Sequence, residues 1–258
     1  MMHYIADKWR DVLVFNQLDS AEKLWALKAD WFEPPNAARG GWSGVCRLDL
    51  QLPAGGTVGV FLKRQENHCY RSLLHPIKGL PTLLKEFNSI RTFETAGIAS
   101  LEPVFFEHWQ IEGDRRAVLL TKELDGFMPL SSEDYKPGGV FASSAGQKAV
   151  IISKLAEITR RMHRHKVQHN CFYLKHVFAK QLEGGDLELR LIDLEKVKQP
   201  YFNGQAVFRD LYSLARHAQH WGIKDQLRFY KRYRQEKKLS PAGKKLWRRI
   251  AARIRAKH

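Results

Sequence analysis

The stretch from Met162 to Leu194 constrains the fold of this chain more than any other part of it. It predicts the end of an amphipathic helix, a polar loop, a short strand, a Gly-Gly turn and a second strand over 189–192. The loop carries His169 and His176, seven residues apart, and the second strand delivers a lone carboxylate, Asp193, at its end. Such a loop and hairpin are typical of metal and phosphate sites, although hairpins that end in aspartate are common.

Composition indicates a globular protein of a reducing compartment. The 258 residues suffice for one large domain or two small lobes, and 44% of them are hydrophobic. The three cysteines show no metal-ligand spacing and cannot all pair, which favours the cytosol. The first 25 residues mix acids with apolar residues, unlike a signal peptide, and no apolar run approaches the roughly 18–20 residues that span a bilayer.

The formal net charge of +16 is concentrated at the C-terminal end, where 227–258 holds thirteen Lys or Arg and one acid, Glu236. Such an end can bind nucleic acid, an anionic membrane or an acidic glycolipid. No recognition-helix or RNP-like pattern is present, so nucleic acid is not an expected partner. Residues 243–257 predict a basic amphipathic helix that either lies on a membrane or packs its apolar stripe on the core.

A glycine-rich segment precedes the first predicted hairpin. Residues 33–45 are expected to form a turn-rich loop, followed by strands over 45–52 and 57–63. Glycines let backbone N–H groups approach phosphates, but they also simply make turns, and the sequence leaves both possibilities open. The candidate phosphate-binding residues of this segment are Gly40, Gly41, Ser43 and Gly44.

A lysine and a glutamate form the next candidate pair. Alternation places Phe61 and Lys63 on the face of the second strand opposite Val60. A helix predicted over 81–96 carries Glu86 within its apolar stripe, and a buried carboxylate needs a cation, for which Lys63 is the obvious candidate. The alternatives are a solvated lysine at a strand end and a glutamate in water at the edge of the stripe.

The remaining pattern divides the chain. Residues 64–80 are expected to form either a mobile substrate flap or a plain surface loop. The other predicted elements are strands over 101–109 and 115–122, a hinge-like linker over 122–126, and helices within 1–30 and over 146–165 and 208–221. We therefore expect an α+β protein with an antiparallel-sheet N-terminal lobe over 1–124 and a mainly helical C-terminal lobe over 125–258.

The order of these pieces resembles a two-lobed protein-kinase-like fold, and the sequence is similar to the Kdo/WaaP lipopolysaccharide kinase family, in its InaA-like branch. The resemblance covers roughly residues 30–235. It is carried by the following motifs: Arg-Gly-Gly-Trp-Ser (39–43), Phe-Leu-Lys (61–63), His-Pro-Ile-Lys-Gly (75–79), Lys-Glu-Phe (85–87), His-Asn-Cys-Phe-Tyr-Leu-Lys-His-Val-Phe (169–178), Leu-Ile-Asp-Leu (191–194) and Arg-Asp-Leu-Tyr-Ser-Leu (209–214).

The resemblance implies ATP- and Mg²⁺-dependent phosphorylation of a core sugar, heptose or Kdo, of lipopolysaccharide or its precursor. It implies a cytoplasmic location, with the basic C-terminal region peripheral on the anionic inner face of the cytoplasmic membrane. Lys63 would hold the α- and β-phosphates and Glu86 would orient it, while 122–124, including Glu123, would line the adenine site. Asp193 would bind the metal ion, and Asp210 would brace the loop.

The sequence departs from the kinase pattern at the catalytic position. Kinases place an aspartate two residues after the first histidine of the loop, where this chain has Cys171, and His176 stands where an asparagine binds the second Mg²⁺. A thiol is a poor oxygen base at neutral pH, and imidazole is a soft ligand for Mg²⁺. His169, or an acidic residue from elsewhere in the chain, is then a candidate to take over the catalytic role. Three hypotheses stay open: an active lipopolysaccharide-sugar kinase, an InaA-like pseudokinase with a regulatory role in envelope stress, and a kinase for another hydroxylated substrate.

Overall fold

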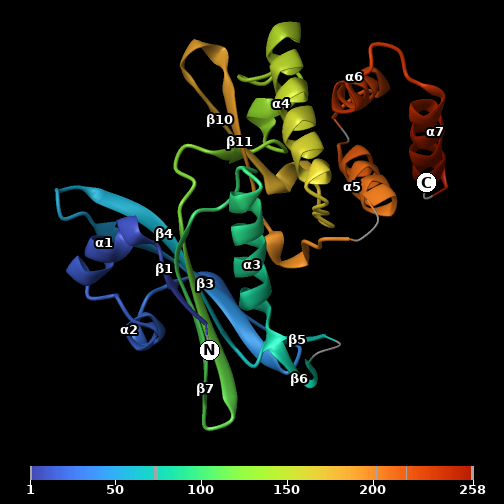
Figure 1. Cartoon of the computed structure of the whole chain (residues 1–258). Coiled ribbons are helices and arrows are strands. Elements are labelled where there is room, and N and C mark those ends of the chain that lie inside the picture. Colours follow the sequence, from blue (N-terminus) through green and yellow to red (C-terminus); the bar gives the residue numbers. More distant parts are fainter. Residues whose placement is uncertain (1, 73–74, 201–202, 219, 257–258) are drawn as a thin grey trace. The chain divides into compact units, whose positions relative to one another are not determined.

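The computed structural model describes residues 2–72, 75–200, 203–218 and 220–256 (Figure 1). Their contacts divide the chain into two compact units. The first unit comprises Met1–Arg91 and Leu101–Asp125, and the second comprises Thr92–Ser100 and Gly126–His258. The first is built around an antiparallel sheet and the second is mainly helical, so the predicted α+β class is confirmed.

The first unit is organised around a six-stranded antiparallel sheet with the strand order β1-β7-β8-β4-β3-β2. The central strand β4 pairs with β3 and β8, which places Lys63 between Val45 and Leu119. The bounds of the strands, in the order of the sheet, are Met2–Ile5, Pro103–Ile111, Asp114–Lys122, Thr57–Glu66, Gly41–Gln51 and Trp31–Ala38.

One face of this sheet carries the hydrophobic core of the first unit. Val60 and Leu62 are fully buried there with residues of the short helices α1 (Arg10–Phe15) and α2 (Ala21–Ala26). The predicted alternation along β4 is therefore confirmed. Arg64 follows on the same face and donates from Nη1 to the carbonyl oxygens of Trp25 and Leu27, at 2.9 and 2.8 Å, where α2 ends.

The expected loop over 33–45 is wrong, because most of it is strand. Strand β2 pairs with β3, and the turn between them lies at Arg39 and Gly40. Pro34 and Pro35 had indicated a loop, since proline cannot donate to a sheet ladder. They are accommodated because β2 is an edge strand with register shifts between Trp31 and Asn36.

The expected loop over 64–80 is also replaced by regular structure. Strand β4 extends to Glu66, and β5 (Cys69–Ser72) and β6 (His75–Pro81) form a separate two-stranded hairpin. Residues 73 and 74 lie outside the described residues, and a role of this segment as a substrate flap stays a prediction. The helix that follows, α3, spans Thr82–Thr95, close to the predicted 81–96.

Within its described residues, the second unit contains the long helix α4, a small sheet and the α-helices α5, α6 and α7. Helix α4 (Ala145–Arg164) begins at a capping box in which Ser144 and Gln147 bond reciprocally. The sheet has the order β11-β10-β9, and β10 and β11 form the predicted hairpin. The bounds are Met128–Pro129 for β9, Val177–Gln181 for β10, Leu187–Leu191 for β11, Asn203–His217 for α5, Ile223–Arg234 for α6 and Pro241–Arg255 for α7.

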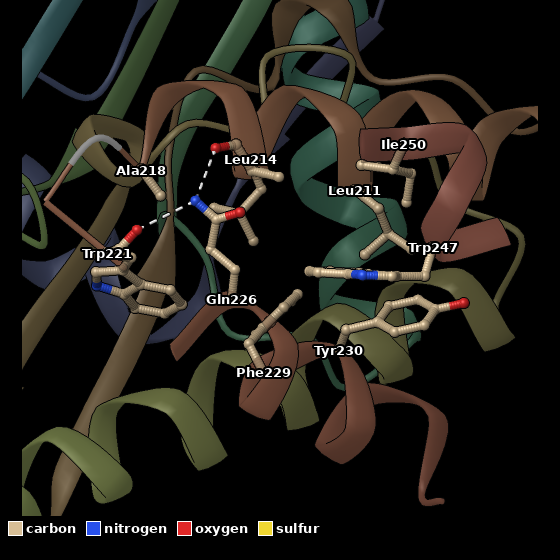
Figure 2. A pocket seen from close by; sticks show the side chains of 10 residues that line it. Leu211, Leu214, Ala218, Trp221, Gln226, Phe229, Tyr230, Trp247 and Ile250 are labelled. Carbon is tan, nitrogen blue, oxygen red and sulfur yellow. Dashed lines mark hydrogen bonds between the residues drawn. The ribbon is translucent and has the colours of Figure 1, made fainter. Parts of the chain in front are cut away.

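The apolar stripe of the C-terminal helix packs inside this unit. Figure 2 shows Trp247 and Ile250 of α7 facing Leu211 of α5 and Tyr230 of α6, around an apolar pocket of about 20 Å³. The Tyr230 hydroxyl also donates to the carbonyl of Gly243 at 2.9 Å. Of the two expectations for this helix, packing on the core is therefore the one observed, and its charged face stays exposed.

Candidate functional site

The predicted lysine–glutamate pair forms within the first unit. Nζ of Lys63 on β4 lies 2.6 Å from Oε1 of Glu86 on α3, and the glutamate side chain is only 6% exposed against 26% for the lysine. Glu86 sits between Leu83 and Ile90 on the buried stripe of α3, and Lys63 is the cation that pairs with this buried carboxylate. The pair leaves the lysine partly accessible, as a residue that binds an anionic ligand must be.

Gln65, which the sequence did not single out, fixes the position of α3. Its side chain is fully buried, and Oε1 accepts from the backbone N–H of Leu83 at 2.8 Å and from the Thr82 hydroxyl at 2.9 Å. Nε2 donates to the carbonyl of His68 at 2.7 Å. Gln65 thus caps the first turn of the helix that carries Glu86, two residues after Lys63 on the same strand. No signal in the sequence pointed to this role, because the burial of Gln65 becomes visible only in the structure.

The candidate phosphate-binding glycines have structural reasons of their own. Gly40 adopts φ +81° in the turn between β2 and β3. A Cβ on Gly41 would lie 2.0 Å from the carbonyl oxygen of Glu66, and one on Gly44 would lie 2.7 Å from the Trp31 ring. Ser43 lies on β3, opposite Gln65 of β4. Their role in phosphate binding stays a prediction.

Phe61 and Glu123, predicted beside the nucleotide base, both have partners within the first unit. The ring of Phe61 meets Phe32 edge to face, with 5.1 Å between centroids. The Glu123 carboxylate accepts from Nε and Nη2 of Arg47 at 2.8–3.1 Å, and these bonds raise the pKa of Arg47. The backbone N–H of Glu123 donates to Gly59 at 2.9 Å, which ties the end of β8 to β4.

In the second unit, Asp210 holds the histidine-containing loop from inside. The residue, on α5, is fully buried, and its carboxylate accepts from the backbone N–H groups of His169 at 2.8 Å and Asn170 at 2.9 Å. Nε2 of His163 lies 3.3 Å away, and Nδ1 of His163 lies 2.9 Å from the hydroxyl of Tyr233. This network joins α4, α5 and α6 to the loop, in the bracing role expected for Asp210.

His169 itself is fully buried, and burial lowers its pKa although the carboxylates of Asp210 and Asp193 act in the opposite direction. Its ring lies nearly parallel to that of His176, with 6.4 Å between centroids. A buried, neutral imidazole suits a role in packing the loop.

Asp193 stands just beyond the end of β11 in a left-handed conformation, φ 59° and ψ 55°. This conformation is uncommon for residues other than glycine, and such strain often marks functional sites. Oδ2 of Asp193 lies 3.4 Å from Nδ1 of His176, and the Asp193 side chain is 36% exposed. Asn170 in the loop adopts the same backbone region, with φ 65°.

Cys171 completes this cluster with a buried thiol. The residue is 6% exposed, and burial, with the adjacent Asp193 carboxylate, raises the pKa of the thiol. Its carbonyl oxygen lies 2.8 Å from Nδ1 of His176. At neutral pH the group is therefore a protonated thiol, which is unsuited to accept a proton from a hydroxyl.

The two residues predicted to bind the metal ion, Asp193 and His176, differ in how well they suit Mg²⁺. Asp193 offers a partly exposed hard oxygen ligand, as Mg²⁺ requires. His176 directs Nδ1 to the Cys171 carbonyl, so only Nε2 is left for a metal ion, and nitrogen is the softer ligand. Among the described residues, no three His, Cys, Asp or Glu side chains gather into a protein-only metal site.

Comparison with known proteins decides the family. The model of the lipopolysaccharide kinase (Kdo/WaaP) family matches residues 22–233. The chain belongs to this family. The chain is also 30% identical over 199 residues to Protein InaA of Escherichia coli (strain K12), covering 77% of this chain and 88% of that protein. The predicted family and its InaA-like branch are thereby confirmed.

The fold of this chain is similar to that of a solved structure. The structure described as WaaP in complex with acyl carrier protein matches with a TM-score of 0.70 and 20% identity, covering 100% of this chain and 98% of that one. The predicted two-lobed protein-kinase-like fold is therefore confirmed. Within the described ranges, no helix has both the length and the apolar character needed to cross a bilayer.

Proposed function

We propose that this member of the family is an ATP- and Mg²⁺-dependent kinase that phosphorylates a core sugar, heptose or Kdo, of lipopolysaccharide or its precursor. The observation that carries the proposal is the pair of Lys63 and Glu86, at 2.6 Å, in a chain of a lipopolysaccharide kinase family. In protein kinases, a strand lysine paired with a helix glutamate is required for phosphoryl transfer.

Each residue then has a defined task in this proposal. Lys63, oriented by Glu86, binds the α- and β-phosphates, and the hairpin of Gly40, Gly41, Ser43 and Gly44 covers them through backbone N–H groups. Phe61 and the strand end at Glu123 contact the adenine. Asp193 binds Mg²⁺, which when present supplies neutralisation of the phosphate charge.

The acceptor side of the proposed reaction works by position. His169 and Asp210 hold the loop, and Cys171 and His176 border the place of the acceptor hydroxyl. A loose transition state for phosphoryl transfer depends more on alignment and charge than on a strong base, so a protonated thiol at this place is compatible with transfer.

The proposed setting is the cytoplasm, at the inner face of the cytoplasmic membrane. Lysines and arginines on the exposed face of α7 would contact anionic headgroups. Because the apolar stripe of α7 already packs against α5 and α6, this contact would be electrostatic and sensitive to salt.

A second candidate function is favoured by one specific observation, the buried Cys171 thiol with its raised pKa. Under this alternative the chain is a pseudokinase that keeps nucleotide binding and serves as a regulatory module in envelope stress. The two candidates differ in turnover and agree in nucleotide binding.

The deciding experiment measures ATP binding and phosphate transfer to purified lipopolysaccharide in the same preparation, with Mg²⁺ present. The kinase proposal predicts transfer that Asp193→Ala abolishes without loss of folding. Asp49→Ala, which removes an exposed carboxylate that pairs with Arg47, is the matched control. Binding without transfer, together with a large gain of transfer in Cys171→Asp, would establish the pseudokinase instead.

A further inference from the structure

A basic groove lies between α4 and α6 in the second unit, among residues that the proposed phosphotransfer does not use. Its volume is about 630 Å³, within the range of small-molecule sites. The wall from α4 is formed by Ser153, Ala156, Glu157 and Arg160.

The wall of the groove that α6 provides is mostly basic. Arg228, Lys231 and Arg232 stand at positions i, i+3 and i+4 and face the groove from one side of α6, and Gln235 follows directly after the end of the helix. The opposite side of α6 carries the buried aromatic residues Phe229, Tyr230 and Tyr233. One face of α6 therefore packs in the core of the unit, and its basic face lines the groove.

The charges of the lining do not cancel. Five cations, Arg160, Arg228, Lys231, Arg232 and Lys237, face two carboxylates, which leaves a formal excess of three positive charges. One of those carboxylates, Glu236, is already engaged, because it pairs with Arg234 at 2.7 Å and accepts from the Ser240 N–H at 2.9 Å at the start of α7.

Four of the cations have no ion-pair partner within the described residues: Arg160, Lys231, Arg232 and Lys237. Like charges that converge on a concave surface repel one another, and a cleft lined with one sign of charge focuses its field on a bound counter-ion. Guanidinium groups add bidentate hydrogen bonds to phosphate oxygens.

We propose that the groove between α4 and α6 is a binding site for a ligand that carries two or more phosphate groups. The volume exceeds the need of a single phosphate, and cations from both walls can contact separate phosphates. Phosphorylated sugars in solution and phosphorylated lipid headgroups share this chemistry. The inference is independent of phosphotransfer, because no residue of the groove takes part in the proposed reaction.

The test uses the full chain and measures binding of sodium tripolyphosphate by isothermal titration calorimetry. Lys231→Gln/Arg232→Gln removes two groove cations. Lys244→Gln/Lys245→Gln removes the same charge from the exposed face of α7 and is the matched control. Allowing for solvent exposure, we expect the groove variant to bind about tenfold more weakly and the control within about threefold of the parent.

A second variant, Arg160→Gln, acts from the opposite wall and should also weaken binding, because both walls contribute. Circular dichroism establishes that each variant is folded. Equal weakening in the groove and α7 variants would show that only the overall charge matters and would overturn the proposal, as would the absence of tripolyphosphate binding by the parent.

Vesicles separate the two sources of phosphate. Phosphatidylcholine vesicles with and without 1,2-dioleoyl phosphatidic acid are sedimented with each variant. Vesicle binding that falls further in the groove variant than in the α7 variant, which removes the same charge from the face proposed to contact headgroups, would assign the site to lipid headgroups. Loss of tripolyphosphate binding alone would assign it to soluble phosphate esters. Binding of polyglutamate without any binding of tripolyphosphate would mean a site for acidic peptides and would refute the phosphate assignment.

Discussion

Replacing Asp210 tests most directly how the histidine-containing loop is held. The carboxylate is fully buried and accepts two backbone N–H groups, from His169 at 2.8 Å and Asn170 at 2.9 Å. Asp210→Ala removes both acceptors and also leaves the ring of His163 without this partner. A buried donor that loses its acceptor costs about 1–3 kcal/mol, so two donors and the space left behind give a loss of about 3–5 kcal/mol.

The conservative variant grades this effect. Asp210→Asn keeps the shape and one acceptor oxygen but places an amide NH₂ against a backbone N–H, so we expect a smaller loss of about 1–3 kcal/mol. In a chain of this size 1 kcal/mol corresponds to about 2–4 °C in Tm, so Asp210→Ala should melt roughly 10 °C lower.

The assay combines thermal unfolding with hydrogen exchange. The amides of His169 and Asn170 should lose protection in Asp210→Ala, because their acceptors are removed, whereas the amides of β4 should not. Asp225→Ala is the matched control: it removes another carboxylate of the same unit, 15% exposed and paired with Lys148 at 3.2 Å, for less than about 1 kcal/mol. If both variants melt alike and the loop amides stay protected, the bracing role of Asp210 is refuted.

Three further predictions concern other parts of the chain. Gln65→Leu leaves the buried N–H of Leu83 unpaired, so it should lower the free energy of unfolding in urea by about 2–3 kcal/mol and should also weaken ATP binding. An unchanged affinity for ATP would show that this helix cap does not position the nucleotide site. Because burial depresses the pKa of His169, folding stability should fall as the pH drops below about 6.5, the unfolded value, and a Tm profile of His169→Gln should show a smaller fall. Ser144→Ala should cost about 1 kcal/mol by removing the capping box of α4 while Ser144→Asp retains most of it, and identical urea midpoints for the two would contradict this.

The sequence predicted correctly those elements in which buried apolar residues recur with the period of a strand or a helix. The alternation along β4 is confirmed because Val60 and Leu62 pack in the core, and the pairing of Lys63 with Glu86 followed from a carboxylate within an apolar stripe. Local propensity was misleading where tertiary pairing prevailed. The two prolines of β2 indicated a loop, and only the sheet reveals an edge strand that tolerates them.

Other contacts between residues far apart in the sequence could not be predicted at the candidate site. Gln65 and Leu83 are 18 residues apart and His163 and Tyr233 are 70 apart, so neither bond leaves a periodic pattern that a single sequence can reveal. The left-handed backbone of Asp193 is likewise invisible, because the residue type favours that region only weakly. Helix α6 was missed because its short aromatic stripe lies within a run of basic residues that reads as solvated.

The histidine-containing loop carries one feature that favours phosphoryl transfer, its well-supported backbone, and one that disfavours it, the thiol of Cys171. The support is complete: Asp210 holds the backbone at His169, and two residues, Asn170 and Asp193, are kept in a costly left-handed conformation. Such strain persists only where the surrounding structure imposes it, so this geometry is maintained at the expense of stability. The position at which kinases place the catalytic aspartate, by contrast, carries the protonated thiol of Cys171. A loop built for positioning with a weak base fits a reaction limited by alignment, and the rate of Cys171→Asp against the parent measures how much a base would add.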